Sequence, residues 1–200
     1  MVLAVLLAVA AASCGWNQPA AKVGKVEISE DQLKADVEAL RTVPELATLF
    51  GAEVPEKGPV PASVTANMLS LRISQLVLAA RFESSKVGLP LDEANRRAED
   101  ERTKLADIDE QLTLQLGSPE TYAKVPASLR EILRTFLLYR DLLLGEVPED
   151  EVLTTVSGIF AASDISVAPR YGSWDSTTFS VVPPEGPGQS PVPSNGPAGS

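Results

Sequence analysis

The sequence predicts a mostly α-helical domain that is closed by a small two-stranded β-ribbon. Long segments repeat apolar residues at helical spacing, and Leu69, Ile73 and Val77 form the clearest stripe. Two short segments, residues 23–28 and 165–167, instead alternate apolar and polar residues, which is typical of half-buried strands. Because one alternating segment precedes the helices and the other follows them, we expect the two to pair and to join the ends of the domain.

Composition excludes several classes of function. The chain has 200 residues, enough for a domain with a sizeable core, and it contains no histidine. Without histidine there can be no Ser-His-Asp triad, no Cys-His dyad and no imidazole general base, and the usual zinc sites are lost as well. The net charge of −10 argues against a nucleic-acid partner, because binding to phosphates needs clustered Lys and Arg. We expect neither an enzyme nor a cofactor.

The N-terminus resembles a bacterial lipoprotein signal. Residues 2–12 form an uninterrupted apolar run that is too short to span a bilayer but suits the apolar region of a signal peptide. Small residues at 11–13 stand directly before Cys14, the single cysteine of the chain. This order resembles a lipobox, in which the Cys is diacylated and becomes the mature N-terminus. We therefore expect residues 1–13 to be a signal peptide and Cys14 to anchor the chain to the extracytoplasmic face of the cell membrane. The alternatives are a plain signal peptide with an incidental Cys and a chance apolar N-terminus.

The first half of the domain follows from local start and stop signals. Residues 14–21 form a polar tether. Ser29 and Gln32 make a capping box, which predicts that a helix begins there. Its inward stripe consists of Leu33, Val37 and Leu40. The stretch 43–62 is rich in Pro and Gly, so it should be largely irregular, with one helical turn near residues 45–50.

The strongest helical pattern covers residues 63–86. Gly88 and then Pro90 end it in the order expected at a helix C-terminus. Asp92 is placed to cap the next helix, which should run to Gly117.

Shorter segments complete the chain. Ser118 precedes a Pro that suits the first position of a short helix. Residues 128–144 predict a helix that is apolar on more than one side, and residues 149–160 predict another short helix. After the strand at 165–167, the Pro/Gly/Ser tail at 181–200 lacks the apolar surface needed to offset the entropy of ordering, so we expect it to be disordered.

Three of these segments match motifs of a known family. Residues 23–29, VGKVEIS, match an opening strand and helix cap, residues 69–88 match a long amphipathic helix, and residues 169–175, PRYGSWD, match a closing strand. In this order they resemble the N-terminal chaperone domain of SurA- and PrsA-type extracytoplasmic foldases, in the short actinobacterial lipoprotein form. The resemblance covers residues 22–180 and implies that the closing strand returns to pair with the first one.

The resemblance also implies a function. In full-length relatives a parvulin-type prolyl isomerase domain precedes the closing strand, but too few residues separate Leu144 from Ile165 for such a domain here. We therefore expect a membrane-tethered, chaperone-like lipoprotein that binds unfolded or newly exported polypeptides and has no prolyl isomerase activity. The alternative is an accessory lipoprotein that binds one specific cell-envelope partner.

A few apolar residues are candidates for contact with client polypeptides, since flexible Met and aromatic surfaces suit promiscuous binding. They are Leu46, Leu49, Phe50, Met68 and Phe82. The same residues could equally belong to the core.

The acidic clusters do not predict a metal site. Residues 107–118 begin like an EF-hand loop, but Leu112 replaces the required Gly and Ser118 replaces the final Glu. Residues 96–104 mix acids and bases, which is typical of a solvated helix face with ion pairs one turn apart.

Arg170, Tyr171 and Trp174 form the densest group of residues that could have a function. We expect the two rings to pack over the helices, and Arg170 to stack on a ring or to pair with an acid.

Overall fold

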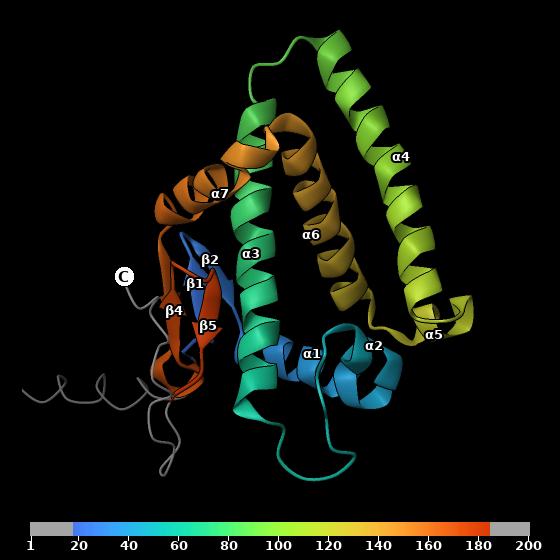
Figure 1. The fold of residues 1–200 in the computed structure, drawn as a ribbon, viewed down its shortest axis with the longest axis vertical. Coiled ribbons are helices and arrows are strands. Elements are labelled where there is room, and N and C mark those ends of the chain that lie inside the picture. Colours follow the sequence, from blue (N-terminus) through green and yellow to red (C-terminus); the bar gives the residue numbers. More distant parts are fainter. Residues whose placement is uncertain (1–17, 185–200) are drawn as a thin grey trace, which may run out of the picture.

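The computed structural model describes residues 18–184 and is mostly helical, with short strands at both ends of the domain (Figure 1). The predicted fold class is confirmed. The helices are α1 (Glu30–Thr42), α2 (Pro44–Leu49), α3 (Ala62–Lys86), α4 (Leu91–Gln115), α5 (Pro119–Lys124), α6 (Ala127–Glu146) and α7 (Val152–Ala161). The strands are β1 (Ala21–Val23), β2 (Val26–Ile28), β3 (Ile165–Val167), β4 (Ser173–Asp175) and β5 (Ser180–Val182).

Local capping signals set the starts of α1 and α5. The backbone N–H of Gln32 donates to Ser29 Oγ at 3.2 Å, and the N–H of Ser29 donates to Gln32 Oε1 at 2.9 Å, so the predicted capping box forms at the start of α1. Ser118 caps α5 in a similar way. The predicted cap at Asp92 is wrong, because α4 begins directly after Pro90 and Asp92 lies inside its first turn. There its charge still faces the positive end of the helix dipole.

The two ends of the domain meet in a sheet with strand order β2-β1-β3. Residues 23–28 do not form the single strand predicted from their alternation. The chain turns at Gly24, whose φ is +56°, so β1 and β2 form a tight antiparallel hairpin. The predicted pairing of the first and last segments is confirmed between β1 and β3, where Val23 lies opposite Ile165.

The C-terminal segment forms a second hairpin. Residues 169–175 were expected to return to the first strand, but this is wrong: Pro169–Tyr171 makes a 3₁₀ turn, and β4 pairs with β5. The hairpin packs on α3, where the N–H of Val181 donates to Ser70 Oγ at 2.8 Å. β5 ends at Val182, beyond the predicted end of the domain, and the predicted tail from residue 185 lies outside the described residues.

α3 is the central helix and packs against α1, α6, α7 and β5. α6 is buried on more than one side, as predicted, because both Leu133 and Leu138 are buried. α4 is different. Its buried side chains, Ile108 and Leu112, lie in its C-terminal half, next to α5 and α6. The N-terminal half of α4 extends beyond the end of α6 at the top of Figure 1 and contributes no buried residue to the core.

Candidate functional site

The five candidate client contacts do not form one surface. Leu46, Met68 and Phe82 are at most 4% exposed and belong to the core, so they line no open groove. Leu49, at 37% exposure, and the partly buried Phe50 lie at the end of α2 and remain at the surface. The sequence left open whether these residues contact a client or belong to the core, because an apolar side chain suits either place.

Cys14 lies outside the described residues, so its lipidation stays a prediction. Within residues 18–184, no helix has the length and apolar content needed to cross a membrane. The described part of the chain also contains no group of three side chains that could hold a metal ion.

Four exposed apolar side chains lie on segments at one end of the molecule, where α3 connects to α4. Val87 is 83% exposed and Leu91 is 78% exposed, and both lie at the connection between these helices. Leu144 near the end of α6 and Leu153 near the start of α7 are also exposed. Figure 1 shows these segments at the same end of the molecule, at the top of the view. We call Val87, Leu91, Leu144 and Leu153 the apolar end. The sequence signal for it was weak, because none of these residues continues a core stripe.

Charged contacts attach the N-terminal half of α4 to α3. Lys86 Nζ lies 2.9 Å from Glu83 Oε1 and 2.9 Å from Glu101 Oε2, so it joins the end of α3 to α4. The hydrogen bond from Lys86 lowers the pKa of Glu83. The Tyr139 hydroxyl, on α6, donates to the same Glu83 oxygen at 3.2 Å. This part of α4 is therefore attached by polar contacts at the surface rather than by core packing.

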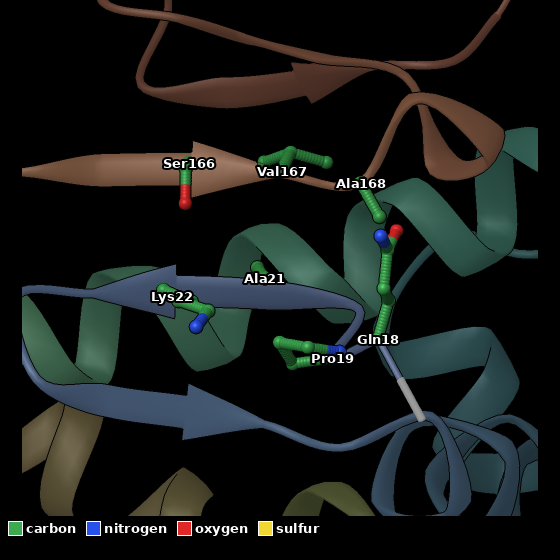
Figure 2. Close-up of a pocket in the computed structure, with 7 residues that line it drawn as sticks. All are labelled: Gln18, Pro19, Ala21, Lys22, Ser166, Val167 and Ala168. Carbon is green, nitrogen blue, oxygen red and sulfur yellow. The ribbon is translucent and has the colours of Figure 1, made fainter. Parts of the chain in front are cut away.

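An open hollow of about 250 Å³ lies beside β1 and β3 (Figure 2). Lys22 and Ser166 come from the two adjacent strands, and Gln18 extends toward Ala168 at one end. Lys22 pairs with Glu27 at 2.6 Å. The side chains around this hollow include no carboxylate pair and no activated nucleophile, so they offer no acid–base chemistry.

The group around Arg170 has the packing role that the sequence predicted. The Arg170 guanidinium lies 4.9 Å from the centre of the Tyr171 ring and 3.5 Å from Glu30 Oε2. It also donates to the backbone oxygen of Gln18 at 2.8 Å. Trp174 stacks on the ring of Phe160, near the end of α7. These contacts fix the segment before β1 against the C-terminal part of the domain.

A buried ion pair joins α1 to α3 and was missed by sequence reasoning. Arg72 donates through Nη2 to Asp36 Oδ1 at 3.0 Å and through Nε to Oδ2. Asp36 is 1% exposed and Arg72 is 9% exposed. The available signal was that Asp36 stands on the same helical face as Leu33 and Leu40, where a polar residue needs a partner.

Comparison with known proteins adds no relative to this picture. No family model matches the chain, and no curated protein or solved structure matches it either. The resemblance to the foldase chaperone domain therefore rests on the residues that carry it and remains a prediction.

Proposed function

We propose that the protein is a chaperone-like module that binds unfolded or newly exported polypeptides, has no prolyl isomerase activity, and is tethered to the extracytoplasmic face of the membrane through lipid on Cys14. The apolar end is the observation that carries this proposal. A protein that holds unfolded chains needs exposed apolar surface together with enough charge to remain soluble. The apolar end supplies the first, and the net charge of −10 supplies the second.

The attachment of α4 supports the same proposal. Because surface ion pairs are worth about 0–1 kcal/mol each, the N-terminal half of α4 can move away from α3 at little cost. The buried side chains of α4 itself lie farther along the helix, so its N-terminal half can move without taking them out of the core. A client segment could then enter beside Leu91 while the domain stays folded.

The central test is suppression of aggregation. The full chain carrying Cys14→Ser, added in stoichiometric amounts, should delay the aggregation of several unrelated denatured clients, measured by light scattering. Val87→Asp together with Leu91→Asp should abolish most of this protection, because charges at the apolar end would repel an apolar client segment. Leu114→Asp is the matched control, since Leu114 is also exposed and lies at the other end of α4. Equal loss of protection in the control and in the double variant would contradict the proposed surface.

Isomerase activity is tested separately. Catalysis of X-Pro rotation must lower a barrier of about 18–20 kcal/mol, which needs a shaped site, and the chain has neither the room for a parvulin domain nor any histidine. The proline-limited phase of client refolding, about 10–100 s, should therefore keep its rate. Acceleration of this phase at catalytic concentration would overturn that half of the proposal.

Lipid attachment has its own test. The wild-type chain, expressed in its bacterial host, should partition into the detergent phase, and Cys14→Ser should partition into the aqueous phase or stay unprocessed. A mass spectrum that shows an unacylated wild-type chain would contradict the lipid anchor.

The alternative function has a distinct outcome. If no unrelated client is protected and crosslinking in intact cells captures one protein, the alternative of an accessory lipoprotein replaces the chaperone.

A further inference from the structure

A second pocket is lined by residues of α4, α5 and α6. In Figure 1, α5 and the start of α6 lie at the opposite end of α4 from the apolar end. Its volume is about 290 Å³. Its polar lining comes from Asp109 on α4, Tyr122 on α5, and Arg130, Glu131 and Arg134 on α6. The proposed chaperone function makes no use of these residues.

Arg134 forms ion pairs with both carboxylates of the pocket. Arg134 Nε lies 2.8 Å from Asp109 Oδ1, and Arg134 Nη1 lies 3.1 Å from Glu131 Oε2. The Tyr122 hydroxyl donates to the same Asp109 oxygen at 2.6 Å. Burial, followed by this hydrogen bond, raises the pKa of Tyr122 to about 12, so the phenol stays protonated and remains a donor. Both carboxylates therefore have partners without Arg130.

Arg130 is the unpaired cation of the pocket. Its guanidinium carbon lies 5.4 Å from the centre of the Tyr122 ring, which orients the side chain, and none of the described carboxylates forms an ion pair with it. The Nε–H of Arg130 is buried and has no hydrogen-bond acceptor among the described residues, whereas Arg134 Nε lies beside Asp109. Buried donors without acceptors are costly and rare. Because the Arg130 side chain also lines the pocket, it is the group that an acceptor from outside the described chain would meet.

The charge of the pocket selects the kind of anion. Two arginines face two carboxylates, so the pocket is neutral when empty, and a single negative charge can be placed against Arg130. A phosphate with two charges would be repelled by Asp109 and Glu131. The pocket also includes Ala127, the first residue of α6, where the positive end of the helix dipole favours an anion. Carboxylates match the planar fork of an arginine side chain.

We propose that this pocket binds a monocarboxylate, with Arg130 as its main contact. The carboxylate could be the C-terminus of a polypeptide or a small free acid, and both present the same group to the pocket.

Acetate is the first probe, titrated into the ¹⁵N-labelled full chain carrying Cys14→Ser, with chloride at equal ionic strength as the reference. We expect a saturable change of the Arg130 Nε–H signal and of the Ala127 amide. Arg130→Gln should weaken binding, read from the Ala127 amide, about tenfold or more. Arg140→Gln is the matched control on the same helix, because Arg140 is exposed and pairs with Asp141, and it should bind acetate like the wild type.

Two further arms identify the source of the carboxylate and guard against misfolding. The first arm uses a short peptide without acidic side chains. If it binds more tightly than acetate, and if amidation of its C-terminus removes this gain, the ligand is the end of a polypeptide. If the peptide binds no more tightly than acetate, the ligand is a small acid. Arg130→Lys keeps the charge but not the fork, so it should retain part of the affinity even if Arg130→Gln fails to fold. The proposal is overturned if acetate acts no differently from chloride, if inorganic phosphate binds more tightly than acetate, or if a folded Arg130→Gln binds like the wild type. None of these outcomes depends on client protection at the apolar end.

Discussion

Replacement of Asp36 by alanine should strongly destabilise the domain. Asp36 accepts two hydrogen bonds from Arg72 between α1 and α3, and both side chains are almost fully buried. Without the carboxylate, the guanidinium of Arg72 stays charged in a region with little water. Breaking a buried pair in this way costs about 3–5 kcal/mol, which is a large share of the 5–15 kcal/mol that usually separates the folded and unfolded states of a domain.

Urea unfolding followed by far-ultraviolet circular dichroism would measure this effect. Asp36→Ala should lower the midpoint while the slope stays unchanged, because the surface exposed on unfolding is the same. Glu38→Ala is a control on the same helix: Glu38 is exposed and pairs with Arg41 at 3.3 Å, so its loss should cost about 0–1 kcal/mol. The double variant Asp36→Leu, Arg72→Met should recover most of the loss, since apolar residues of similar volume often replace a buried pair without cost. If Asp36→Ala costs no more than Glu38→Ala, Arg72 reaches water and the reasoning from burial is wrong.

Three further perturbations test other parts of the fold. Gly172→Ala should lower the melting temperature and loosen the β4–β5 hairpin, because φ is +117° and the added Cβ would lie 1.9 Å from the backbone oxygen of Val182; a melting curve like that of the wild type would contradict this geometry. Between pH 10 and about 12, stability should fall as pH rises, because Tyr122 loses its proton at lower pH in the unfolded chain than in the folded one. Urea midpoints taken across that range should fall less steeply with pH in Tyr122→Phe than in the wild type. An equal slope in both would show that other groups cause the pH dependence. A chain cut after Ser163 loses β3, β4 and β5 and should aggregate or unfold without cooperativity, whereas a chain cut after Pro184 should melt like the full one.

Local chemistry explains which elements could be predicted from the sequence. The capping box at Ser29 and the stop signals at Gly88 and Pro90 act within a few residues, so the start of α1 and the end of α3 could be predicted without knowledge of the tertiary packing. The turn at Gly24 was missed because alternation looks the same in one long strand and in a two-residue hairpin. The β4–β5 hairpin depends on its packing against α3, which no local pattern in the sequence reports.

The same distinction applies to the candidate sites. Apolar periodicity could not separate Met68, which is buried, from Leu91, which is exposed, because both fit a helix and only the tertiary packing differs. The pocket where α4, α5 and α6 meet joins Asp109, Tyr122 and Arg130 from three different helices. Each of these residues looked like an ordinary position on a helix surface, and only the folded structure shows that Arg130 pairs with no acid among residues 18–184.

The pairing of β1 with β3 has a consequence for the order in which this chain can fold. Val23 finds its partner Ile165 only after about 140 residues of intervening chain, and closing a loop of that length costs about 4 kcal/mol in the length-dependent part of its entropy alone. A chain that emerges N-terminus first, from a ribosome or a translocation channel, presents β1 long before β3 exists. The β1–β2 hairpin is too small to be stable by itself, so the sheet is completed late, after the helices have brought the ends of the domain together. The pairing of β1 with β3 can therefore form only after nearly the whole domain has emerged.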